Sequence, residues 1–150
     1  MIEEIVENKG AVCATILAAL PGWFQLPAAN AAFVRDVEAM PMLGAIVMDQ
    51  PVGFLALKVH TLAAAEIHVM GVRPEHHRKG LGRALIRAAA QMMRADGMRY
   101  LTVKTLAPSH PDPGYANTRA FYESAGFSPV EVFPLLWDAE NPALMMVKAL

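Results

Sequence analysis

Residues 73–85, RPEHHRKGLGRAL, decide how this chain folds. Immediately before them, the run AEIHVMGV (residues 65–72) is rich in β-branched and apolar residues and predicts a strand. After them, apolar residues recur at helical spacing, at Leu81, Ala84, Leu85, Ala88, Ala89 and Met92. Gly80 and Gly82 therefore lie where a strand gives way to a helix. The junction predicts either an ordinary turn or a site for a phosphorylated ligand.

The physical argument for a ligand site rests on the start of the helix. Backbone N–H groups in the first turn of a helix lack partners, and the helix dipole is positive there, so anions bind well. Glycines let the backbone approach phosphate oxygens closely, and Arg78, Lys79 and Arg83 add positive charge. The spacing fits neither the P-loop nor the dinucleotide fingerprint. From these residues alone, both interpretations stay open.

Composition limits the class of protein. A chain of 150 residues with 55% hydrophobic and 18% charged residues is typical of one globular domain, so we expect a single domain over residues 1–150. The acidic opening MIEEIVENKG does not resemble a signal peptide, and no unbroken apolar run is long enough to span a membrane. We therefore expect a cytoplasmic protein with no membrane partner. The single cysteine, Cys13, lies in an apolar helical stretch and predicts a buried thiol.

The charge is unevenly distributed. The net charge is −1, but residues 73–104 contain eight Lys or Arg residues and only two acidic ones. A nucleic-acid-binding domain is typically basic over a broad surface. A local basic cluster in a nearly neutral chain favours a small polyanion, so we expect no nucleic-acid partner.

Periodicity and turn residues predict the remaining elements. Helices are expected over residues 10–20, 30–40, 81–97 and 117–125, with Asn30 and Asn117 as N-caps. Strands are expected over residues 43–48, 52–60, 65–72, 98–106, 127–137 and 142–150. This order predicts an α/β domain with one mixed, mostly antiparallel sheet of about six to seven strands, flanked by about four helices.

Four segments, in order and spacing, resemble the GNAT superfamily of N-acetyltransferases over roughly residues 43–128. They are QPVGFLAL, AEIHVMGV, HRKGLG (residues 77–82) and NTRAFYESAGF. The third is similar to the signature Gln/Arg-x-x-Gly-x-Gly/Ala, with His77 in place of Gln or Arg. The resemblance implies a GNAT-type fold and acetyl-CoA as co-substrate.

The resemblance also implies which residues bind the cofactor. The pyrophosphate would lie against the loop and helix start, at His77, Arg78, Lys79, Gly80, Leu81, Gly82 and Arg83. Met70 would polarise the thioester carbonyl through its backbone N–H, and Val72 would pair with the pantetheine arm. Gly71 is consistent with a bulge between them. Asn117 would contact the cofactor as well as cap its helix.

Acetyl transfer needs an uncharged amine, whereas a lysine-type amine has a pKa near 10.4, so a base is required. Glu66 matches the position of a catalytic glutamate in some members of the family. The alternative is a solvated residue at the start of a strand. His68, on the same face, is a substitute base or an ordinary sheet histidine.

Tyr122, in FYESAGF, resembles the general acid of the family, which protonates the CoA thiolate. Its neighbour Phe121 is the expected core residue. Cys13 lies in the wrong element to serve as a nucleophile, so we expect direct attack by the amine in a ternary complex.

These observations predict an N-acetyltransferase with a small-molecule or peptide amine as acceptor, no metal ion, and a possible homodimer. The acceptor would be framed by aromatic and acidic side chains at Trp23, Phe24, Phe33, Glu131, Trp137, Asp138 and Glu140. Two alternatives remain: a non-catalytic acyl-CoA-binding module, and an unrelated α/β protein that binds another phosphorylated ligand.

Overall fold

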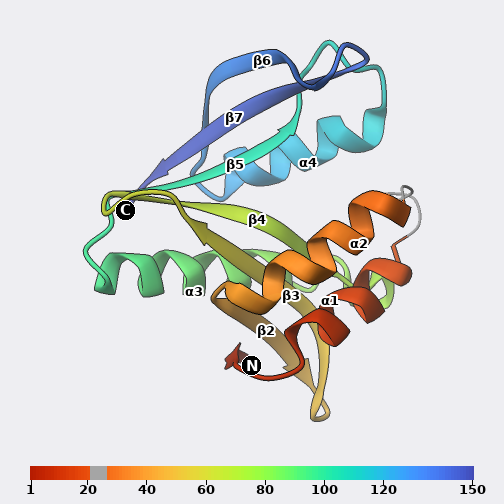
Figure 1. The fold of residues 1–150 in the computed structure, drawn as a ribbon, viewed down its shortest axis with the longest axis vertical. Helices are drawn as coiled ribbons and strands as arrows, with labels where there is room; N and C mark the ends of the chain where they lie inside the picture. Colours follow the sequence, from red (N-terminus) through yellow and green to blue (C-terminus); the bar gives the residue numbers. More distant parts are fainter. Residues whose placement is uncertain (21–26) are drawn as a thin grey trace. The chain divides into compact units, whose positions relative to one another are not determined.

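The computed structural model describes residues 1–20 and 27–150, and Figure 1 shows their fold. The strands are β1 (Ile2–Ile5), β2 (Met42–Val47), β3 (Gln50–Val59), β4 (Ala64–Val72), β5 (Tyr100–Leu106), β6 (Ser128–Asp138) and β7 (Asn141–Ala149). The α-helices are α1 (Lys9–Ala18), α2 (Pro27–Asp36), α3 (Leu81–Ala95) and α4 (Pro113–Ser124), with short 3-10 helices at η1 (Val37–Ala39) and η2 (Pro74–His76). The seven strands form one mixed sheet in the order β1-β2-β3-β4-β5-β7-β6. The predicted fold class is confirmed.

The described chain divides into two compact units. The first contains Met1–Lys58 and His68–Met92, and the second contains Val59–Ile67 and Met93–Leu150. Strand β4 contributes its first four residues to the second unit and the rest to the first. Among the described residues, no helix is long and apolar enough to cross a membrane.

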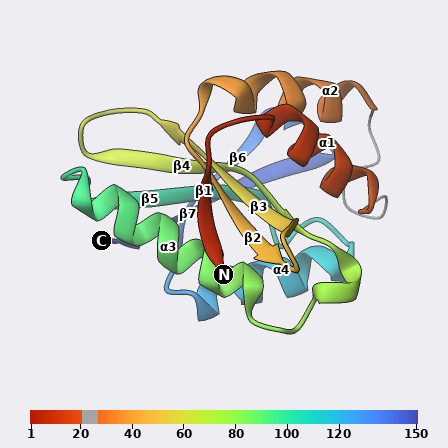
Figure 2. The same ribbon diagram turned by 90° about the horizontal axis from the view of Figure 1, so that it is seen from below.

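The core of the first unit is built on α1. Apolar residues at helical spacing, Cys13, Ile16, Leu17 and Leu20, are all buried. They pack with β-strand residues such as Phe54 in one cluster. Figure 2 shows α1 and α2 on one face of β2 and β3, with α3 on the other. The prediction of a buried thiol at Cys13 is confirmed, and burial raises its pKa to about 11.

Gly71 on β4 is explained by packing against α1. A Cβ added there would lie 3.0 Å from Leu20 Cδ1 and 3.4 Å from Ile16 Cγ2. Only a residue without a side chain lets the helix approach the strand this closely. The bulge expected at this glycine stays a prediction.

The buried face of helix α3 is shifted by about one residue toward the C-terminus, compared with the face predicted from the sequence. The buried residues are Leu85, Ile86, Ala89, Ala90 and Met93, whereas Leu81, Ala84, Ala88 and Met92 are half-buried. The predicted pattern gave equal weight to alanines and to larger side chains. Burial instead favours Ile86 and Met93, because larger apolar side chains remove more area from water.

In the second unit, β4 and β5 pair in parallel from Ala64↔Tyr100 to Ile67↔Val103. Strand β7 pairs antiparallel with both β5 and β6. Strand β6 is at the edge of the sheet and is exposed along almost its whole length. This half of the sheet brings the first four residues of β4 against β5.

Some predicted boundaries were wrong. Strand β1 was missed because four residues, IEEI, are too short to show a pattern, and they become a strand only by pairing with β2. Asn30 is not an N-cap, since α2 already begins at Pro27. Proline is favoured at the first position of a helix, and this signal was not used.

Candidate functional site

The loop that joins β4 to α3 lies in the first unit and is held at its beginning. Arg73 N donates to Val52 O at 2.8 Å, and the next residues form the turn η2. The ring Nε2 of His77 donates to Val72 O at 2.5 Å. Two contacts therefore fix the loop to the ends of its neighbouring strands before it reaches the helix.

The backbone of this loop has a conformation that would let a ligand approach it closely. Arg78 and Gly80 have left-handed conformations, with φ of 62° and 80°. Such a conformation costs a non-glycine residue about 1–2 kcal/mol, and strain of this kind is common at ligand sites. A Cβ added at Gly80 would meet no atom within 4 Å. The space beside the Gly80 backbone is therefore open.

The start of α3 and the cations beside it make the electrostatic potential at the loop positive. The helix begins at Leu81 and has no acidic residue in its first turn. Arg78, Lys79 and Arg83 are all exposed. Unpaired N–H groups, the helix dipole and these cations favour one kind of ligand, an anion with several oxygens.

Met70 and Val72 lie on one face of β4. In this strand, Glu66 is buried and His68, Met70 and Val72 are half-buried, whereas the alternate residues are fully buried. Successive side chains of a strand alternate between faces, so these four residues share the more open one. The backbone roles expected of Met70 and Val72 stay predictions.

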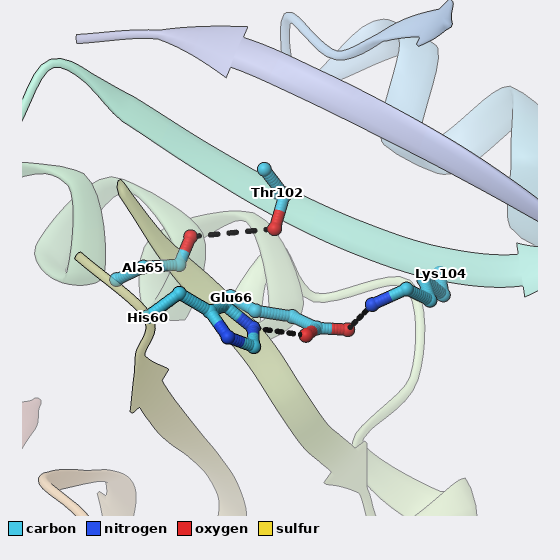
Figure 3. Close-up of polar contacts among 5 residues, drawn as sticks. All are labelled: His60, Ala65, Glu66, Thr102 and Lys104. Carbon is cyan, nitrogen blue, oxygen red and sulfur yellow. Dashed lines mark hydrogen bonds and ion pairs between the residues drawn. The ribbon is translucent and has the colours of Figure 1, made fainter. Parts of the chain in front are cut away.

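The carboxylate of Glu66 is hydrogen-bonded by two side chains of the second unit (Figure 3). His60 Nε2 lies 2.6 Å from Glu66 Oε1, and Lys104 Nζ lies 3.0 Å from Oε2. Glu66 is only 8% exposed. The alternative interpretation of Glu66, as a solvated residue at the start of a strand, is therefore wrong. Each carboxylate oxygen has its own hydrogen-bond donor.

These contacts set the ionisation of Glu66. Burial by itself would raise the pKa of its carboxyl group. The hydrogen bonds from His60 and Lys104 and their charges act in the opposite direction, and together they lower the pKa below the ordinary value. Glu66 is thus held as a carboxylate at neutral pH.

His60 and Lys104 were missed by the sequence analysis. His60 lies directly after β3, in the connection to β4, where its backbone N–H donates to Ala64 O at 3.1 Å. Lys104 lies two residues beyond Thr102, the partner of Glu66 in the β4–β5 register, and therefore on the same face. The signal in the sequence was that Thr102 and Lys104 are polar and alternate with apolar residues along β5, which places both on one face. It becomes informative only once the register is known.

Tyr122 lies in an aromatic setting within the second unit. Its ring contacts Phe121 at 5.4 Å and Phe127 at 5.7 Å between centroids. It is buried, which raises the pKa of its hydroxyl to about 12. The expectation that Phe121 would be the core residue of this pair is wrong, because Phe121 is only half-buried. Tyr122 remains protonated at neutral pH, the form a general acid needs.

Asn117 is not the N-cap of α4. The helix begins at Pro113, and the Asp112 side chain accepts a hydrogen bond from Gly114 N at 2.8 Å. Asp112-Pro113 is an N-cap followed by proline at N1, which moves the start four residues earlier than predicted. The contact of Asn117 with a cofactor stays a prediction.

The predicted acceptor residues are only partly described. Trp23 and Phe24 lie outside the described residues. Phe33, on α2, makes an edge contact with His68, at 5.6 Å between centroids. Asp138 accepts hydrogen bonds from Glu140 N and Asn141 Nδ2, so its carboxylate stabilises the β6–β7 turn.

His68, the substitute base of the sequence analysis, has a carboxylate partner. Its Nε2 lies 3.1 Å from Asp36 Oδ2, and both residues belong to the first unit. Within the described ranges, no three His, Cys, Asp or Glu side chains gather in a group able to hold a metal ion.

Comparison with known proteins assigns the chain to a family. Residues 38–129, more than half of the chain, match the acetyltransferase (GNAT) domain. A mycothiol acetyltransferase of Beutenbergia cavernae is 40% identical over 76 residues, which cover 51% of this chain and 24% of that protein. The chain therefore matches only about a quarter of the length of this curated relative.

Solved structures share the whole fold. A protein from Desulfovibrio desulfuricans described as a GNAT-family acetyltransferase superposes with a TM-score of 0.84 and 22% identity, over 99% of this chain and 98% of the other. An aminoglycoside 6'-N-acetyltransferase in complex with coenzyme A gives a TM-score of 0.79 and 18% identity, over 99% and 96% of the two chains. The match to the family model and the shared fold agree, and the chain belongs to the GNAT acetyltransferase family.

Proposed function

We propose that this protein transfers an acetyl group from acetyl-CoA to a primary amine by direct attack in a ternary complex. The observation that carries the proposal is the β4–α3 loop. It combines two left-handed residues, open space beside Gly80 and the start of a helix without acidic residues. These features fit a pyrophosphate, and a structural neighbour of the same fold is complexed with coenzyme A.

The residues of the loop have different proposed roles in binding the cofactor. Backbone N–H groups at Gly80, Leu81 and Gly82 would bind the pyrophosphate oxygens, with Arg78, Lys79 and Arg83 neutralising charge. His77 fixes the loop to β4 through Val72. When bound, acetyl-CoA supplies an activated acyl group as a thioester. The expected roles of Met70, Val72 and Asn117 complete the proposed cofactor site.

The chemistry needs a base and an acid. Glu66 is proposed as part of the general base, because it is held as a carboxylate on the open face of β4. Tyr122 is the proposed acid, because its raised pKa keeps its proton in place until the thiolate leaves. Their pKa values are moved in opposite directions, a common arrangement for an acid and a base in one enzyme.

A second candidate function is an acyl-CoA-binding module without catalysis. Both oxygens of Glu66 are engaged by the protein, which favours this alternative. The acceptor class is proposed to be a cationic small-molecule or peptide amine. A cytoplasmic location, the absence of nucleic-acid, membrane and metal partners, and a possible homodimer stay predictions.

Release of free CoA thiol in the presence of an amine panel tests the proposal. The panel contains an aminoglycoside, a polyamine, a lysine-containing peptide and a peptide with a free N-terminus. We expect turnover with at least one class, and acetylated product by mass spectrometry. Saturable acetyl-CoA binding with no turnover on any amine would instead identify the non-catalytic module.

A further inference from the structure

The environment of His60 is that of an oriented imidazole. Its Nε2 is 2.6 Å from Glu66 Oε1, and Lys104 holds the other carboxylate oxygen at 3.0 Å. The second contact prevents the carboxylate from rotating away from the ring. Figure 3 shows the carboxylate between the side chains of His60 and Lys104. All three residues lie in the second unit: His60 directly after β3, Glu66 on β4 and Lys104 on β5.

The hydrogen bond fixes the tautomer of the neutral ring. An ionised carboxylate only accepts hydrogen bonds, so Nε2 must carry the hydrogen. The lone pair of neutral His60 is then on Nδ1. Among the described residues, none is hydrogen-bonded to Nδ1. The His60 side chain is 39% exposed, compared with 11% for Glu66. The more exposed base of this pair is therefore the imidazole, with its lone pair on Nδ1.

We propose that His60 Nδ1 accepts the proton of the attacking amine, and that Glu66 acts as a positioning residue that orients His60 and stabilises its imidazolium form. This inference rests on the proposed function and names the atom that carries its base. It follows from the difference in access between the two groups. Direct proton transfer to Glu66 would have to reach a carboxylate that is only 8% exposed and whose two oxygens each already accept a hydrogen bond.

The proton balance is complete without a further reactant. The ammonium gives one proton to His60 Nδ1, and the free amine forms a bond to the thioester carbonyl carbon. As the C–S bond breaks, Tyr122 gives its proton to the thiolate and receives the second proton of the amine nitrogen. His60 then releases its proton to water. The products are the acetamide, CoA thiol and one proton.

His68 is the competing imidazole. Its partner Asp36 is 3.1 Å away with a 45% exposed side chain, and the His68 side chain itself is 19% exposed. No second cation is recorded on the Asp36 carboxylate within the described residues. This pair is longer and its carboxylate is less enclosed, which makes His60 the better-oriented imidazole.

Nitrogen NMR of histidine-labelled protein tests the geometry without any turnover. At a pH where His60 is neutral, we expect the Nε2–H tautomer, assigned by loss of the signal in His60→Gln. The Glu66→Gln variant should lose this tautomer preference. A His60 ring protonated on Nδ1 in the wild-type protein would overturn the proposal, whether or not an amine substrate is known.

Steady-state kinetics test the role. We expect His60→Gln to lower kcat roughly 10²–10⁴-fold, to remove the acidic limb of the pH–rate profile, and to leave the acetyl-CoA Kd unchanged. Added imidazole should restore part of the rate in His60→Ala, which a purely structural role would not allow. His110→Gln is the matched control, a histidine of the same unit whose Nδ1 accepts from Asp112 N and whose ring contacts Tyr115.

The outcomes of these experiments distinguish the proposed acetyl transfer from the proposed role of His60. If wild-type protein neither binds acetyl-CoA nor acetylates an amine, the proposed function fails, and the tautomer still decides whether the oriented imidazole exists. If wild-type protein turns over but His60→Gln keeps its rate and its acidic limb, this inference fails and the proposed function stands. Loss of the limb in His68→Gln alone would assign the proton to the other pair.

Discussion

Glu66 and Tyr122 are both buried ionisable residues of the second unit, but their surroundings are opposite. Glu66 has a hydrogen-bond donor on each carboxylate oxygen, and its pKa is lowered. Tyr122 is packed between aromatic rings, and its pKa is raised to about 12. Burial disfavours the charged form of both groups, and only Glu66 has partners that outweigh it. At neutral pH one group is therefore kept ionised and the other protonated.

The difference would allow one unit to provide for both of the proposed proton transfers. A carboxylate that is charged and enclosed is suited to orienting and stabilising a neighbouring cation. A tyrosine with a raised pKa keeps its proton at neutral pH, which is the form from which it could donate to a departing thiolate. Three substitutions test this contrast.

The largest effect is expected for Tyr122→Phe. Removing the hydroxyl should lower kcat roughly 10²–10⁴-fold, because the thiolate then leaves without a proton donor. Acetyl-CoA affinity and the free energy of unfolding should change little, since no described residue is hydrogen-bonded to this hydroxyl. Stopped-flow thiol release and urea unfolding measure the two quantities. An unchanged kcat would remove Tyr122 as the acid.

A smaller effect, on stability, is expected for Glu66→Gln. A depressed carboxyl pKa stabilises the folded state above the unfolded value, near 4.3, and this stabilisation is lost as pH falls through the folded pKa. The variant should therefore be about 2 kcal/mol less stable at pH 7, and the difference should shrink toward pH 3. Urea unfolding at pH 7, 5 and 3 gives the curve. A difference that is constant with pH would contradict the lowered pKa.

The smallest effect is expected for Lys104→Met, which keeps the apolar stem and removes the charge. His60 still pairs with Glu66, and Lys104 is partly exposed, so we expect a loss of about 1 kcal/mol at pH 7. The loss should disappear below the pKa of Glu66. Lys58→Met, at an exposed lysine, is the control. Equal losses in the two variants would mean that the contact with Glu66 contributes nothing.

How much of the fold could be predicted depends on how local each signal is. The α3 helix and the strand before it were predicted because their patterns are continuous in the sequence. The starts of α2 and α4 were misplaced because Pro27 and Asp112-Pro113 were read as loop residues. Strand β1 has no pattern of its own and depends on its pairing with β2.

The same distinction applies to the candidate site. The proposed cofactor loop is contiguous, so residues 77–83 could be proposed from their resemblance to the GNAT signature. The partners of Glu66 are not contiguous: His60 reaches it across a hairpin, and Lys104 reaches it from 38 residues away through the β4–β5 register. Sequence analysis identified Glu66, but its ionisation depends on neighbours that only the paired sheet brings together.

The measurement that tests the central claim most directly is calorimetric titration of the folded protein with acetyl-CoA, with ATP and NAD as controls. Gly80→Ala serves as the matched variant, because an added Cβ meets no protein atom but fills the open space at a left-handed φ. The account predicts selective, saturable binding of acetyl-CoA by the wild-type protein and weaker binding by the variant. No binding by the wild-type protein, or equal binding of all three ligands, would contradict a CoA site at this loop.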